Sequence, residues 1–233
     1  MLRIFKHLRS KEAMKFSKNY ILYAIGEIFL VVIGILIALY INNQSEIYKE
    51  KKIEKILLEK LKEENLYNLD ILEKDEAYRA KLPKIYYDFI NYLSYNEIKE
   101  LNDSVEYFMT NTIRTTTFSF SKTNLVNYIN SQKNYFPEIN KETIYLENLQ
   151  NDLSILSEKT VDLKIEDYYK HLISDMDFNT GEVFSFKGLN SVEFRNNLNL
   201  IYSVETEISG IYLETLNQIR KIDTLLNTTL KEE

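Results

Sequence analysis

The sequence contains no cysteine and no tryptophan, and among its 233 residues only two are proline, five are glycine and two are histidine. Without cysteine the chain has no disulfide and no thiolate ligand, so its fold depends on packing in any redox environment. Because proline and glycine are the residues that usually end helices and form tight turns, their scarcity favours long helices. The predicted fold class is therefore all-α.

Residues suited to catalysis are also scarce. His7 lies in a basic N-terminal segment, whereas His171 follows Asp167 by four residues, a spacing at which a carboxylate could orient it as a base. No nucleophile motif accompanies this pair, so an ordinary histidine near a helix end is the preferred interpretation. The sequence has no glycine-rich phosphate loop, no H-E-x-x-H and no G-x-S-x-G. We therefore predict a protein that is not an enzyme and uses no cofactor.

Charge is distributed unevenly along the chain. Residues 1–19 carry six basic side chains and one acidic side chain, a net charge of +5. Residues 42–233 carry 23 basic and 33 acidic side chains, a net charge of −10, which argues against a nucleic-acid partner because phosphate contacts require clustered Lys and Arg. The basic segment directly precedes an apolar run, as is typical of the cytoplasmic side of a membrane span.

Residues 20–41, from Tyr20 to Ile41, are predicted to form a transmembrane helix that contacts the lipid bilayer. At about 1.5 Å per residue they would extend roughly 33 Å, enough for a hydrocarbon core of about 30 Å. A cleaved signal peptide is the alternative, but its apolar region would be about 7–15 residues and would end in a small-x-small site. Here the apolar run continues to Asn42, so we expect an uncleaved anchor that follows a cytoplasmic tail of residues 1–19.

Glu27 is the one charged residue in the predicted span. A carboxylate near the bilayer centre costs about 2.5–3.5 kcal/mol on insertion scales. At about 100° per residue, Gly34 and Ala38 lie within roughly 40° of Glu27 on the helix surface. Because small residues let helices approach closely, Glu27, Gly34 and Ala38 form a predicted association face for a second copy or a partner membrane helix. Two alternatives are tolerance of a lone acid by snorkelling or protonation, and proton or ion coupling.

Beyond Asn42 no proline occurs before Pro83, so the helix is predicted to continue over residues 42–78 as a stalk. Its apolar stripe is expected to pack on its own domain rather than to form an extended coiled coil. Residues 79–233 are predicted to form a helical extracytoplasmic domain, an antiparallel bundle. Residues 115–120 are β-branched or aromatic and are expected to form a loop or a short extended segment. The predicted helices are 84–93, 97–112, 121–132, one beginning at Pro137, and one from the N-cap Ser191 to about Leu230, whose apolar face Glu205 interrupts.

The clearest predicted loop follows Ser174. Asp175, Asp177 and Asn179 alternate as calcium ligands do, but an EF-hand requires glycine at the sixth position and glutamate at the twelfth. Gly181 is seventh and Phe186 is twelfth in this register, so a plain polar turn is preferred. The chain also has 18 tyrosines and 12 phenylalanines, which we expect mainly in the core rather than in an interaction groove.

Residues 23–43 read YAIGEIFLVVIGILIALYINN. This run resembles the signature of a large family of uncharacterised single-pass membrane proteins of Bacteroidetes bacteria. The resemblance is specific over about residues 20–46 and weaker beyond, and Gln44-Ser45-Glu46 stand where the family usually has a tryptophan. It implies an anchor in the bacterial inner membrane, a helical periplasmic domain and a family pattern that includes Glu27, and it implies no activity.

The leading hypothesis from the sequence is a membrane-anchored periplasmic interaction or scaffold protein. One alternative is an accessory subunit of an ion-coupled membrane motor or transporter, for which Glu27 would be the coupling group. Another alternative is a periplasmic ligand-binding domain, which would need a polar pocket around His171 or the loop at Asp175.

Overall fold

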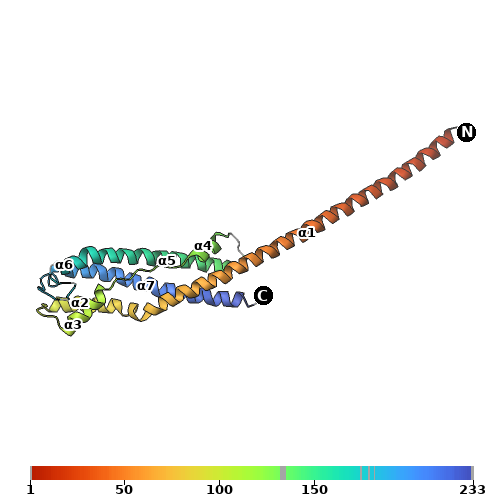
Figure 1. Ribbon diagram of the computed structural model, residues 1–233. Helices are drawn as coiled ribbons and strands as arrows, with labels where there is room; N and C mark the ends of the chain where they lie inside the picture. The colour runs from red at the N-terminus through yellow and green to blue at the C-terminus, as the bar shows by residue number, and fades with distance from the viewer. Residues whose placement is uncertain (1, 132–134, 174, 178, 181, 232–233) are drawn as a thin grey trace. The chain divides into compact units, whose positions relative to one another are not determined.

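A computed structural model describes residues 2–131, 135–173, 175–177, 179–180 and 182–231, with the side chains of Tyr20 and of those from Tyr23 onward. The fold is all-α, as predicted, and within the described residues the strand-like element is an isolated antiparallel bridge between Met176 and Val183. The α-helices, which Figure 1 labels, are α1 (Leu2–Arg79), α2 (Leu82–Tyr95), α3 (Asp103–Ile113), α4 (Thr123–Asn130), α5 (Pro137–Leu163), α6 (Tyr169–Ile173) and α7 (Val192–Thr229). The π-helix η1 (Lys164–Tyr168) lies between α5 and α6.

The chain divides into two compact units, Met1–Ile53 and Glu54–Glu233, here called the N-terminal unit and the bundle. The N-terminal unit consists of the first part of α1. An 18-residue window of this helix has a mean hydropathy of 2.6, and none of it is buried within the structure. The helix is therefore long and apolar enough to cross a membrane.

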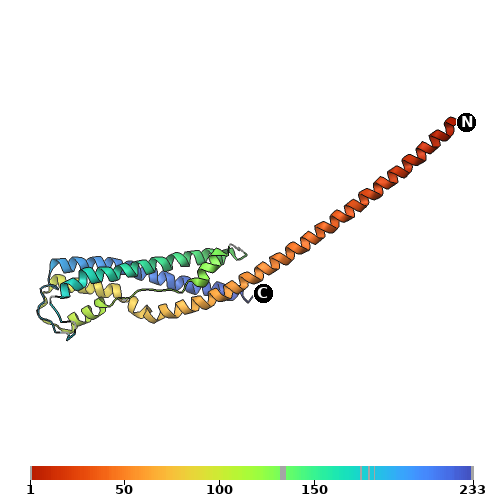
Figure 2. The same ribbon diagram turned by 45° about the horizontal axis from the view of Figure 1, so that its top comes forward.

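Three long helices build the bundle: the last part of α1, α5 and α7. Arg79 contacts Glu205, whereas the Tyr212 hydroxyl donates a hydrogen bond to the Leu72 carbonyl, so α1 and α7 run in opposite directions. Figure 2 shows α5 and α7 side by side along the bundle. The predicted antiparallel bundle is confirmed, and the stretch of α1 from Glu54 to Arg79 is part of it.

Side-chain caps explain where the structure agrees with the predicted helix ends and where it differs. The Ser191 hydroxyl accepts the Phe194 N–H at 3.0 Å, which confirms the predicted start of α7. The prediction for α3 was wrong at its start, because Asn102 caps this helix by accepting the N–H of Ser104 and of Val105. The helix expected over 121–132 is shorter, Thr123–Asn130, and residue 132 lies outside the described residues.

An extended segment, residues 114–122, connects α3 to α4 alongside the long helices (Figures 1 and 2), which confirms the predicted interruption of helix over 115–120. The Phe118 N–H donates to the Ser157 hydroxyl at 3.2 Å, and Ser154 donates to the Phe118 carbonyl at 3.0 Å. Asn68 binds both the N–H and the carbonyl of Ser121, at 3.0 and 2.8 Å. These side chains provide hydrogen-bond partners for the main-chain N–H and carbonyl groups of the extended segment, which form no helical hydrogen bonds.

Gly188 is held in close contact with the end of α6. A Cβ at this position would lie 2.1 Å from the main-chain oxygen of His171, and the Gly188 N–H donates to Asp175 at 2.6 Å. We expect Gly188→Ala to lower the free energy of unfolding by about 1–3 kcal/mol, because one of these backbones must move. The measurement is urea denaturation followed by circular dichroism.

Gly210 supplies the matched control for this prediction. It is exposed within α7, and a Cβ there would meet no atom within 4 Å. Gly210→Ala should therefore raise the free energy of unfolding by about 0.5–1 kcal/mol through helix propensity. If Gly188→Ala and Gly210→Ala changed the free energy of unfolding in the same direction, Gly188 would not be in a close contact.

Candidate functional site

The predicted association face lies on α1 in the N-terminal unit. Glu27, Gly34 and Ala38 are all exposed, and a Cβ at Gly34 would meet no atom within 4 Å. Val31, between Glu27 and Gly34 on this face, is 58% exposed. Glu27 also lines a shallow groove along the helix, together with Ala24, Ile28, Val31 and Val32. Within the described part of this unit, the face is open to another helix.

A face of this composition is suited to helix association in lipid. Gly34 and Ala38 place little bulk between two backbones, so a second helix can approach closely and gain van der Waals contact. The Glu27 carboxyl group can donate a hydrogen bond when protonated and can accept one in either state. Close approach and a polar contact are therefore available at the same face.

The bundle contains a buried cluster of charged side chains, which we call the ion layer and define as Arg79, Lys164 and Glu205. Arg79 Nη1 lies 2.8 Å from Glu205 Oε2, and Lys164 Nζ lies 2.9 Å from Glu205 Oε1. The side chains are 1–3% exposed. Lys164 also donates to the Arg114 carbonyl at 2.7 Å. The ion layer thus joins α1, η1, α7 and the extended segment.

Two cations and one carboxylate give the ion layer a formal charge of +1. Burial lowers the pKa of the Lys164 ammonium, and the nearby Glu205 carboxylate opposes this effect. Arg79 Nε is buried and has no hydrogen-bond partner among the described atoms. Burial of this cluster therefore costs desolvation free energy, because a single carboxylate faces two buried cations.

Aromatic rings surround the two cations. The Arg79 guanidinium lies 4.9 Å from the centre of the Phe118 ring, and Lys164 Nζ lies 5.6 Å from the centre of the Tyr86 ring. Burial raises the pKa of the Tyr86 hydroxyl well above its ordinary value. This hydroxyl remains a donor and binds the Thr112 carbonyl at 3.0 Å. The rings contribute cation–π attraction while they exclude water from the ion layer.

From the sequence alone, Glu205 is expected only to interrupt the apolar face of α7. The signal that could have revealed its role is the presence of a carboxylate at an inward-facing helix position, which requires a buried cation nearby. The sequence does not indicate which of its 29 Lys and Arg side chains supply that charge.

A second buried carboxylate, Glu64 on α1, caps the start of α4. Glu64 Oε1 accepts the Leu125 N–H at 2.8 Å, and Oε2 accepts the Asn124 N–H at 2.9 Å and the Ser121 hydroxyl at 3.1 Å. These N–H groups lie in the first turn of α4 and have no partner within the helix. Glu64 therefore ties a helix 60 residues away to α1.

The structure also describes the surroundings of His171 and of the loop that contains Asp177. His171 Nε2 lies 3.8 Å from a carboxylate oxygen of Glu193, so the acid beside it comes from α7 and is not the predicted Asp167. Asp177 accepts the Asn179 N–H at 2.8 Å, an interaction of a polar turn. Gly181 lies outside the described residues. Among the residues that the structure describes, no group of three His, Cys, Asp or Glu side chains could hold a metal ion.

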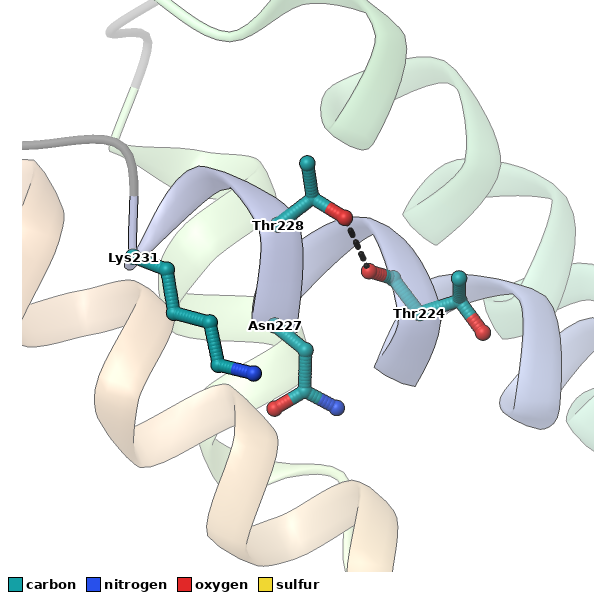
Figure 3. A pocket seen from close by; sticks show the side chains of 4 residues that line it. All are labelled: Thr224, Asn227, Thr228 and Lys231. Carbon is teal, nitrogen blue, oxygen red and sulfur yellow. Dashed lines mark hydrogen bonds between the residues drawn. The ribbon is translucent and has the colours of Figure 1, made fainter.

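Open grooves with polar side chains occur among the described residues of the bundle. Figure 3 shows one at the end of α7, lined by Thr224, Asn227, Thr228 and Lys231, in which the Thr228 hydroxyl donates to the Thr224 carbonyl at 3.0 Å. Another lies at the end of α2, where Arg195 donates to the Leu93 carbonyl at 3.1 Å. In both grooves these polar groups satisfy helix carbonyls, as is common where helices end or bend.

No family model, no curated protein and no solved structure matches this chain. Of the features described above, the Glu27 face is exposed and chemically suited to binding, whereas the ion layer and Glu64 are buried within the bundle.

Proposed function

We propose that this protein is a single-pass interaction or scaffold protein of a bacterial inner membrane, with its N-terminus in the cytoplasm and the bundle in the periplasm. Support comes from the exposed apolar helix with a mean hydropathy of 2.6. The net charge of +5 over residues 1–19 supports this orientation, because positively charged segments remain on the cytoplasmic side. The resemblance of residues 23–43 to a Bacteroidetes single-pass family supports the same compartment.

The association surface in this proposal is the face that contains Glu27, Gly34 and Ala38. The observation that carries it is that one carboxyl group and two small residues, about two to three helical turns away, share an open helix face. In lipid, a second helix that covers this face shields the carboxyl group from hydrocarbon and packs closely at the small residues. The partner is a second copy of the chain or another membrane helix.

Crosslinking of the full-length protein in native membranes tests this proposal. Glu27→Leu is expected to weaken association by about 1–2 kcal/mol, because leucine can neither donate nor accept a hydrogen bond between membrane helices. Gly34→Leu should remove the crosslinked species, because a branched side chain then separates the backbones.

Gly26→Leu is the matched control, because Gly26 is also an exposed glycine with no atom within 4 Å of an added Cβ. It lies about 100° around the helix from Glu27 and should leave the crosslinked species intact. If Glu27→Leu and Gly34→Leu leave the pattern unchanged, the span is an anchor without an association role.

An accessory subunit of an ion-coupled motor or transporter is the second candidate, favoured by an ionisable group within the apolar window. The two functions differ in their response to Glu27→Asp. Ion coupling requires a titratable carboxyl group, so Glu27→Asp would retain part of an energised process that Glu27→Gln abolishes. Equal phenotypes for the two variants would speak against coupling.

A further inference from the structure

The bundle has two separate hydrophobic cores. The first, which we call the α4 core, is formed by α1, α4, α5 and α7 from Val204 onward, with the Phe118 ring of the extended segment. The second, the α2 core, is formed by α2, α3, η1, α6 and α7 up to Tyr202, with Tyr78 of α1 and Leu163 of α5 packed against it. On α7 the change from one core to the other thus falls between Tyr202 and Val204, next to Glu205.

The ion layer occupies the boundary between the cores. Arg79 contacts the Phe118 ring of the α4 core, whereas Lys164 lies near the Tyr86 ring of the α2 core. Glu205 binds both cations. The nearest core residues on either side along the chain are Leu72 and Tyr78 on α1, Leu156 and Leu163 on α5, and Tyr202 and Val204 on α7.

Regular helix also ends at this boundary in two of the three long elements. α1 ends at Arg79, and α2 starts at Leu82. α5 ends at Leu163, and the π-helix begins at Lys164. Short π-helical turns are rare and often occur at functional positions. Only α7, among the long helices, passes the ion layer without interruption.

Buried charge and interrupted α-helices both weaken the connection between the two cores. A continuous apolar core would resist relative motion of its two ends, because any displacement would open cavities. A layer of buried ions adds no comparable apolar burial, and replacement of such layers by apolar residues is often neutral or stabilising. The two cores are therefore joined at the layer by polar contacts, by α7 and by the continuous helical path from α5 through η1 to α6.

We propose that the bundle is hinged at the ion layer, so that the elements of the α2 core move as a body relative to the α4 core through bending of α7 and of the π-helical turn η1. The contacts of Glu205 with Arg79 and Lys164 fix the arrangement described here. Such motion is a hinge of the kind in which a few residues at element ends absorb the change in backbone angles.

Because the chain has no cysteine, two introduced cysteines can be spin-labelled specifically for distance measurements on the full-length protein. One pair, Tyr95→Cys with Lys141→Cys, spans the hinge, and the control pair, Tyr67→Cys with Lys141→Cys, lies within the α4 core elements. All three positions are exposed. Labelled chains are diluted with unlabelled chains to exclude distances between copies. The distance distribution across the hinge is expected to be about twice as wide as the control, as for domain-scale motion.

A variant that removes the ion layer, with Arg79→Met, Lys164→Met and Glu205→Leu, is expected to narrow the distribution across the hinge to the width of the control, because the two cores then become continuous. Equal widths in the unsubstituted protein would overturn the hinge, whether or not the triple variant folds. A folded triple variant that keeps the wide distribution would also overturn it, since the ion layer would then not separate the cores.

Discussion

Glu205→Gln is expected to lower the free energy of unfolding of the bundle by about 3–5 kcal/mol, the loss typical when one partner of a buried ion pair is removed. Both carboxylate oxygens are used, one by Arg79 at 2.8 Å and one by Lys164 at 2.9 Å. Glutamine offers a single acceptor oxygen, and its amide nitrogen would face one of the two cations. The substitution therefore leaves buried positive charge without an opposing charge.

The neighbouring acid on α7 provides the control for this measurement. Glu207 is exposed, so Glu207→Gln should change the free energy of unfolding by less than about 0.5 kcal/mol. Urea denaturation of the full-length protein in detergent, followed by circular dichroism, gives both values. A loss of the same small size in the two variants would mean that Glu205 does not compensate the buried cations.

Glu64→Ala is expected to lower the free energy of unfolding by about 2–4 kcal/mol, because each buried donor that loses its acceptor costs about 1–3 kcal/mol. The affected donors are the Leu125 N–H, the Asn124 N–H and the Ser121 hydroxyl. Part of this cost is recovered where water reaches the freed groups. We also expect faster hydrogen exchange at the first amides of α4 than in the unsubstituted protein.

Glu63 is exposed on the same helix and is the matched control for Glu64. Glu63→Ala should leave both the denaturation midpoint and the exchange of the α4 amides almost unchanged. If Glu64→Ala destabilises the bundle but α4 exchanges as before, the carboxylate acts through burial on α1 and not as a cap.

The helical architecture could be predicted because local signals determine it. The shortage of proline and glycine, the apolar periodicity and the N-cap Ser191 are all readable from neighbouring residues. The start of α3 was predicted too early, because several nearby residues favour helix and only the structure shows that Asn102 caps it. Local sequence thus gives the type of an element more reliably than its boundary.

The buried polar sites could not be predicted, because their partners lie far apart in sequence. Arg79 and Glu205 are 126 residues apart, and Glu64 caps a helix 60 residues away. No periodicity in one helix identifies a partner on another. The Glu27 face, in contrast, is a property of one helix, so it could be derived from spacing alone. Its association role stays a prediction until it is tested.

The pairing of α1 with α7 also affects how the chain folds during synthesis. The Tyr212 hydroxyl reaches a carbonyl 140 residues earlier in the chain, and Leu58, Leu61 and Leu72 of α1 share a core with α7. A ribosome produces α1 first and α7 last, so the part of this apolar stripe that α7 covers is exposed for most of translation. A nascent chain that stops before Val192 still contains α4 and α5 but lacks α7, and we expect chaperones and proteases to recognise the apolar surface that α7 would bury.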